Sequence, residues 1–316
     1  MKDNWERVYE RMDLSRETVE RMVHAFMPSA AVASFAPAGG GFSNSNFQVR
    51  LRGGGEPMLL RVYRNADATC RKEAAIHRLV AERVRVPAFL HLDDRCEIIG
   101  RPFAFLEWID GRPMNEAEDK REAAEAAGRA LAAIHGFSFE KPGFLSEALQ
   151  VTEPLAAGPE MLRAFAGDSL ANGRAGQWLG EAEAERLRRF VEEHAEMLRV
   201  VEDDAVLVHS DFNVWNLLTT PEGRDVAAVI DWEFAFAASP LGDIGNMLRY
   251  ERPGSGFEVD FIKGYTEAGG ILPDEWRKLA KLLDLIALLD LLNRSEGGKN
   301  RITDLKELIH RTQEEM

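Results

Sequence analysis

Short runs of alternating apolar and polar positions, separated by glycines, dominate the first third of the chain. In residues 46–52 every second position is apolar, which is typical of a half-buried strand. Residues 53–55 are all glycine and signal a hairpin, so residues 58–63 are predicted to form the returning strand. The remaining elements expected here are a helix at residues 70–83 and strands at residues 31–35, 89–92 and 103–108.

After residue 111 the apolar positions recur mostly at helical spacing. The expected helices are residues 116–135, 181–199, 240–250, 257–268, 273–292 and 303–315. One β-rich island, residues 206–231, interrupts them with two apolar runs, each of which leads into polar residues that include an aspartate. The pattern predicts an α+β protein with a small antiparallel sheet in residues 1–106, a connection at 107–111 and a helical part in 112–316.

Composition limits the setting and the partners. No apolar run approaches the ~20 residues of a membrane span, and the first residues lack the apolar stretch of a signal peptide. Cys70 and Cys96 form no C-x-x-C pair, so a reducing, cytoplasmic compartment is expected. The net charge of −14 disfavours nucleic acid and anionic membranes as partners. It favours cationic small molecules, although it could serve solubility alone. The oligomeric state is left unknown.

The β-rich island, residues 206–231, contains the candidate catalytic residues. His209, Asp211 and Asn216 have the H-x-D-x-x-x-x-N spacing of a kinase catalytic loop, and Asp231 ends the next apolar run. Phosphoryl transfer needs a carboxylate near the acceptor hydroxyl, ligands for Mg²⁺ and positive charge on the phosphates. The spacing alone is a weak signal, and the two motifs that follow it in close succession strengthen it.

Three motifs then suggest a family: HSDFNVWNLL at residues 209–218, AVIDWEFA at 228–235 and PLGDIGN at 240–246. In this order they resemble the aminoglycoside phosphotransferase and choline kinase-like family, which shares the two-lobed protein kinase fold. The resemblance covers roughly residues 30–295. It implies that ATP is the phosphoryl donor, that Asp211 is the catalytic base, and that Asn216 and Asp231 hold Mg²⁺.

Two further residues have two interpretations each. His209 supports the loop in the family, and a buried residue that bonds loop backbone is favoured over direct catalysis. Asp243 resembles the helix-borne carboxylate that anchors the catalytic loop, but an ordinary acidic residue at a helix start fits equally well.

The sequence signal for a nucleotide-binding site is weaker than that for the catalytic loop. Residues 39–46 are rich in glycine and small polar residues, and Ser43 and Asn44 are candidates for contacts to phosphate; an ordinary hairpin turn is the alternative. Arg61 stands where protein kinases keep a lysine, and Glu73 on the following helix is its expected partner. By resemblance, the backbone of Glu107 and Ile109 would bind the adenine edge.

The predicted function is an ATP-dependent transfer of phosphoryl to a hydroxyl of a small molecule. An aminoglycoside or another cationic acceptor competes with metabolic acceptors such as choline, homoserine or a sugar, because the fold does not determine the acceptor. A pseudokinase without turnover is the alternative from another class. The presence of Asp211, Asn216 and Asp231 together disfavours it.

Overall fold

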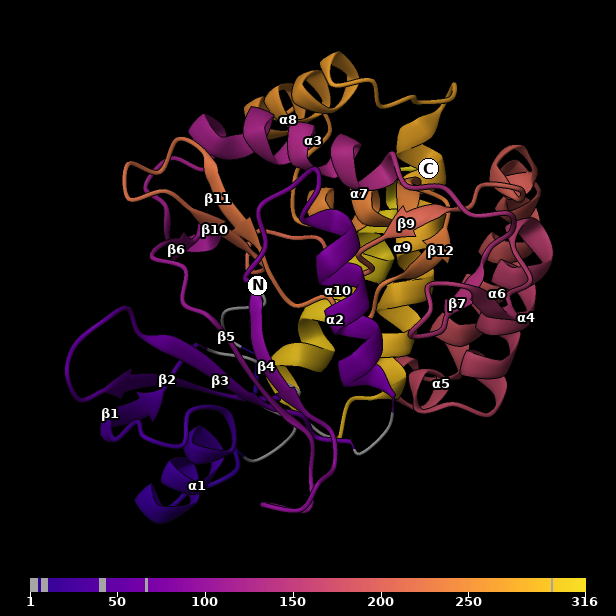
Figure 1. The fold of residues 1–316 in the computed structure, drawn as a ribbon. Helices are drawn as coiled ribbons and strands as arrows, with labels where there is room; N and C mark the ends of the chain where they lie inside the picture. Colours follow the sequence, from indigo (N-terminus) through magenta and orange to yellow (C-terminus); the bar gives the residue numbers. More distant parts are fainter. Residues whose placement is uncertain (1–4, 7–10, 40–43, 66–67, 297) are drawn as a thin grey trace.

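The computed structural model describes residues 5–6, 11–39, 44–65, 68–296 and 298–316. A five-stranded antiparallel sheet forms the first lobe, in the order β1-β2-β3-β5-β4. Figure 1 shows this lobe at the lower left, with the helical lobe above and to its right. The sheet and its two helices are β1 (Val32–Pro37), β2 (Ser45–Leu51), β3 (Met58–Val62), β4 (Phe89–Asp93), β5 (Phe103–Glu107), α1 (Arg16–Phe26) and α2 (Thr69–Val80).

The helical lobe follows β5 and residues 108–111. Its helices are α3 (Arg121–His135), α4 (Gly158–Ala171), α5 (Arg174–Leu179), α6 (Glu181–His194), α7 (Leu241–Leu248), α8 (Gly256–Glu267), α9 (Trp276–Asn293) and α10 (Lys299–Glu314). Its short strands are β6 (Arg112–Pro113), β7 (Gly143–Leu145), β8 (Val151–Pro154), β9 (Val206–Val208), β10 (Leu217–Thr219), β11 (Val226–Val229) and β12 (Phe236–Ala238). Short 3-10 helices span Met114–Glu116 and Ala195–Val201.

Several expected elements are corrected. The helix predicted at residues 116–135 begins only at α3, because the Asp119 carboxylate accepts from the Arg121 N–H at 2.9 Å and residues 117–120 are not helical. The helix predicted at 181–199 ends at His194 and passes into a 3-10 turn. The island is not a single sheet: β10 pairs with β11 and β6, whereas β9 pairs with β12 and β7 lies beyond it.

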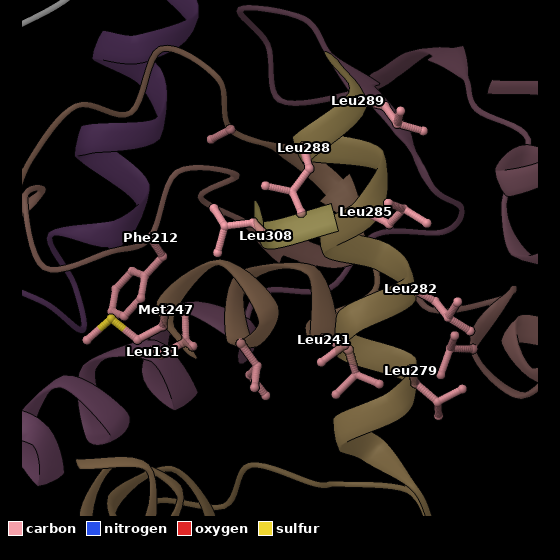
Figure 2. Packing of buried hydrophobic residues seen from close by; sticks show 14 of the residues in the cluster. Leu131, Phe212, Leu241, Met247, Leu279, Leu282, Leu285, Leu288, Leu289 and Leu308 are labelled. Atoms are coloured by element: carbon pink, nitrogen blue, oxygen red, sulfur yellow. The ribbon is translucent and has the colours of Figure 1, made fainter. Parts of the chain in front are cut away.

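The core of the helical lobe surrounds α9. Figure 2 shows leucines on both sides of α9, with Leu288 on the side of Leu308 and Leu282 on the opposite side. Leu241 and Met247 of α7, Leu131 of α3 and Phe212 belong to the same cluster. Ile76 and Val80 of α2 also belong to this cluster, while α1 and the sheet form a second one. Within the part of the chain that the structure describes, no helix is long and apolar enough to cross a membrane.

Candidate active site between the two lobes

The β10–β11 hairpin brings Asn216 and Asp231 to one end of the same ladder. Leu217 pairs with Val229, and the Ile230 N–H donates to the Asn216 carbonyl at 3.0 Å. Asp231 has a φ of 70°, in the left-handed region that an aspartate rarely adopts. Such strain is found mainly where a side chain must be aimed at a functional point. The hairpin therefore places an amide and a carboxylate side by side.

Asp211 is held by two asparagine side chains. Nδ2 of Asn213 donates to its Oδ1 at 2.6 Å, and Nδ2 of Asn216 donates to its Oδ2 at 2.8 Å. Both Nδ2 atoms also contact the Asp211 carbonyl, so the carboxylate and its own backbone are fixed together. Sequence reasoning missed Asn213; its only signal was an Asn two residues after Asp211, a spacing that often bonds locally.

A second carboxylate anchors the backbone of residues 209–216, the candidate catalytic loop, called the catalytic loop below. Asp243 of α7 is fully buried and accepts from the N–H groups of His209 and Ser210, both at 2.7 Å. Its Oδ2 also lies 3.3 Å from Nε2 of His135. Ser210 has a φ of 70°, so the loop takes a strained turn directly before Asp211. This geometry agrees with the anchoring alternative for Asp243.

His209 is a support for the loop. It is fully buried, and its Nε2 lies 3.0 Å from the Ile230 carbonyl. Its Nδ1 accepts from the Asp211 N–H at 3.3 Å, which requires the proton on Nε2. The ring also lies against Trp232, with centroids 4.6 Å apart. Both ring nitrogens are thus engaged with backbone, and the structural interpretation of His209 is the one that fits.

Arg61 joins the sheet lobe to the hairpin. Its Nη1 lies 3.2 Å from Oε1 of Glu73 on α2, and its Nη2 forms an ion pair with Asp231. Burial opposes the charge of Arg61, but the two carboxylates outweigh burial and raise its pKa well above the usual value. The expected pair of Arg61 with Glu73 is present. Arg61 therefore stays charged at the point where phosphates would meet the hairpin.

The glycine-rich turn is only partly described. Ser43 lies outside the described residues. Nδ2 of Asn44 donates to Oε2 of Glu233 at 2.9 Å, and its Oδ1 accepts from the Arg64 N–H at 3.1 Å. Burial and the nearby Asp231 raise the pKa of Glu233 to about 7. The Asn44 side chain thus links the turn to the segment after β11 and is already engaged on both of its polar ends.

The segment after β5 narrows which backbone atoms could bind an adenine. The Glu107 N–H donates to the Ala88 carbonyl at 2.8 Å, and the Glu107 carboxylate pairs with Arg85. The Glu107 carbonyl is therefore the backbone group of this residue that could meet an adenine edge. Across the described chain, the backbone of Ile109 takes part in no hydrogen bond, and its N–H could serve as a donor.

The oxygens around the hairpin fit Mg²⁺. Nδ2 of Asn216 donates to Asp211. The side-chain oxygen of Asn216, Oδ1, is therefore the atom of this amide that could bind a cation. The Asp231 side chain is 29% exposed, so one carboxylate and one amide oxygen can serve as ligands. Mg²⁺ usually takes one or two protein oxygens and completes its shell with phosphate and water. Over the described ranges, no group of three or more His, Cys, Asp or Glu residues forms a metal cage.

Solved structures resemble the whole chain. An aminoglycoside phosphotransferase APH(4)-Ia, solved with ADP and hygromycin B, has a TM-score of 0.72 at 17% identity and covers 94% of this chain and 98% of its own. A protein assigned as a fructosamine-3-kinase of Thermobifida fusca has a TM-score of 0.63 at 20% identity, covering 94% and 99%. These likenesses confirm the predicted two-lobed, kinase-like α+β fold.

Two curated sequence relatives are much longer proteins, and the chain matches about a quarter of their length. Acyl-CoA dehydrogenase family member 10 of Mus musculus is 27% identical over 245 residues, and member 11 of Gallus gallus is 24% identical over 222 residues. The matches cover 72% and 66% of this chain but only 21% and 27% of those proteins. The model of the phosphotransferase enzyme family matches residues 34–282, most of the chain, and the protein therefore belongs to that family.

Proposed function

We propose that this protein transfers the γ-phosphoryl group of ATP to a hydroxyl of a small molecule. The observation that carries the proposal is the Asp211 carboxylate, held at 2.6 and 2.8 Å by Asn213 and Asn216 beside the hairpin that bears Asp231. Family membership supports the reaction class. The donor is supported by the ADP bound in the APH(4)-Ia complex, whereas another neighbour is a GDP complex.

Each residue of the site has a step in this reaction. Asp211 orients the acceptor hydroxyl and takes its proton as the oxygen bonds to the γ-phosphorus; the bond from that phosphorus to the β–γ bridging oxygen breaks, and ADP leaves. Asn216 and Asp231 would hold Mg²⁺, which neutralises charge on the phosphates when bound. Arg61 supplies a fixed positive charge beside them, and Glu73 keeps its side chain in place.

The acceptor class has two candidates. The net charge of −14, together with the hygromycin B of the APH(4)-Ia complex, favours a cationic amino-sugar antibiotic. The curated relatives instead bear the name acyl-CoA dehydrogenase family member, which favours a hydroxylated acyl thioester or another metabolic alcohol. Two acidic candidates for contact with a cationic acceptor are engaged elsewhere, because Glu233 binds Asn44 and Asp284 is buried against Arg249.

The test is ADP release that depends on an acceptor. ATP and Mg²⁺ are supplied with single members of a panel: aminoglycosides, choline, homoserine, sugars and hydroxyacyl thioesters. We expect one class to raise ADP release well above the rate without acceptor, with a phosphorylated product detected by mass. Nucleotide binding without product from any member would instead support the pseudokinase alternative.

A further inference from the structure

A buried ion pair joins α7 to α9 close to the catalytic loop. Nε of Arg249 lies 3.2 and 3.0 Å from the two carboxylate oxygens of Asp284, and Nη2 lies 2.6 Å from Oδ1. Both side chains are almost fully buried. A buried ion pair is weak evidence for stability, since apolar residues of similar volume often serve as well or better.

The guanidinium of Arg249 also reaches Asn246, one turn earlier on α7. One terminal atom of the Asn246 amide lies 3.0 Å from Nη2 of Arg249, and the other lies 3.1 Å from the Phe212 carbonyl and from Nδ2 of Asn213. Nδ2 of Asn213 already donates both of its hydrogens to Asp211. The amide of Asn246 is therefore satisfied when its oxygen accepts from Arg249 and its nitrogen donates to Phe212.

Through these contacts α7 binds the catalytic loop at two points, which we call its two holds. Asp243 binds the N–H groups of the two residues before Asp211, and Asn246 binds the carbonyl of the residue after it. Residues three apart lie on one face of a helix. The Phe212 ring is seated beside Met247 and Leu131, which fixes the side chain of the same residue (Figure 2). The loop is thus clamped on both sides of Asp211.

The geometry points to Arg249, held by Asp284, as a positioning residue for phosphoryl transfer: through Asn246 it fixes the stretch of loop that follows Asp211. The kinetic part of this inference rests on the proposed function, while the structural part does not. Burial opposes the charge of Arg249, yet Asp284 and, to a smaller extent, Asp211 raise its pKa, which agrees with a cation set close to the catalytic carboxylate.

The variant that tests this replaces the whole pair, Arg249→Met with Asp284→Leu. Replacing both partners avoids a lone buried charge, so the chain should still fold. The control is Arg277→Met with Glu258→Gln, which replaces an ion pair between α9 and α8. Among the described residues, the hydrogen bonds and ion pairs of these two side chains do not involve residues 206–218. Thermal unfolding of both variants establishes that the fold is kept.

The kinetic readout separates kcat from KM. We expect the pair-replaced variant to lose about ten- to a hundredfold in kcat, the cost of a misplaced catalytic group, with the KM for ATP unchanged. Asn246→Ala is then combined with the pair replacement. If Arg249 acts through Asn246, the combined loss in kcat is smaller than the product of the separate losses. Independent losses, or a control variant that loses as much, would overturn the inference.

A second readout needs no turnover. Hydrogen exchange of residues 206–218 should be faster in the pair-replaced variant than in the wild type and in the control, because the loop loses one of its two holds. Equal exchange in all three proteins would refute the inference even for an active enzyme. A wild type that phosphorylates none of the acceptors would refute the proposed function instead, and hydrogen exchange would still decide the role of Arg249.

Discussion

At the residue scale, hydrogen bonds fix side chains around Asp211. Nδ2 of Asn216 donates to Asp211, and both ring nitrogens of His209 contact backbone groups. These bonds leave the two side chains little freedom to turn. The Asp211 carboxylate is therefore preorganised, and if it is the catalytic base, its replacement should affect chemistry more than binding.

Asp211→Asn should remove most of the chemistry and leave nucleotide binding nearly intact. A carboxamide cannot take the acceptor proton, and it can accept from only one of the two asparagines that now donate to Asp211. General-base catalysis contributes about 10²–10⁴-fold, and the loss should fall on kcat. ATP affinity and acceptor-dependent kcat are measured on one preparation. A variant that keeps more than about a tenth of the wild-type rate would exclude Asp211 as the base.

His77 should make stability depend on pH. It is buried on α2, its Nδ1 donates to the Pro87 carbonyl at 2.8 Å, and its Nε2 lies 3.8 Å from Glu73. Burial lowers its pKa, with Glu73 acting in the opposite direction. The unfolded chain takes up a proton near pH 6.5 that the folded one resists, so stability is present above that pH and is lost as pH falls through it.

The test compares the wild type with His77→Asn, which keeps a donor for Pro87 but does not titrate. Urea unfolding at pH 7.5 and 5.5 gives the free energy of unfolding for each protein. We expect the wild type to lose more stability than the variant over this range, by up to about 1.4 kcal/mol for the unit below pH 6.5. Parallel losses in the two proteins would show that His77 takes up its proton equally in both states.

At the element scale, the close approach of α7 to α9 determines where the residues of α7 lie relative to the catalytic loop. A Cβ at Gly245 would stand 2.4 Å from the Ala280 carbonyl oxygen and 3.0 Å from the Asp284 Cβ. Only glycine allows the two helices to lie so near, and this separation lets Asp284 reach Arg249. The same helix carries Asp243, so a shift of α7 would move both holds on the catalytic loop.

Gly245→Ala should therefore destabilise the protein by about 1–3 kcal/mol, the usual cost of overpacking. Gly242→Ala on the same helix is the control, because a Cβ there meets nothing within 4 Å. We expect that control to change stability by less than about 1 kcal/mol, in the stabilising direction. Thermal unfolding compares them. Similar effects at both glycines would mean that α7 and α9 can separate without cost.

Most elements with a strong local pattern could be predicted, and those defined by distant partners could not. The alternation in residues 46–52 and the triple glycine after it gave β2 and β3 with nearly the observed bounds. Helix α1 was missed although Val19, Met22 and Val23 recur at helical spacing and the Ser15 side chain caps the first turn. Asn213 was missed although its partner Asp211 lies only two residues away. The role of Arg249 could not be predicted, because its partner Asp284 comes from another helix and no spacing displays the contact.

At the scale of the whole molecule, contacts other than the 108–111 connection also join the lobes. Ile76 and Val80 of α2 lie in the core of the helical lobe, and Arg61 pairs across to Asp231. The start of the chain adds a third link: Nε1 of Trp5 donates to Asp304 of α10 at 2.9 Å. Glu6 accepts from the N–H groups of Asn300 and Arg301 at the start of that helix. Nucleotide and acceptor would therefore meet between lobes that are tied at several points.

The net charge of −14 gives a prediction at the same scale. If the acceptor is cationic, the field of the acidic molecule should concentrate it near the surface, so its KM should rise with ionic strength. The Debye length shortens from about 30 Å at 0.01 M salt to about 8 Å at 0.15 M, so this range tests the reach of the field. KM is measured at both salt concentrations for the best acceptor.

The control for this prediction is a neutral acceptor of the same panel, or the KM for ATP if no neutral acceptor is used. Salt also weakens contacts to the phosphates, and the KM for ATP should therefore rise or stay constant for reasons unrelated to the acceptor. A cationic acceptor whose KM rises severalfold while that of the neutral one does not would assign the acidic surface a role in substrate capture. A KM that is independent of salt for the best acceptor would remove the electrostatic argument, and would favour a neutral acceptor such as a sugar.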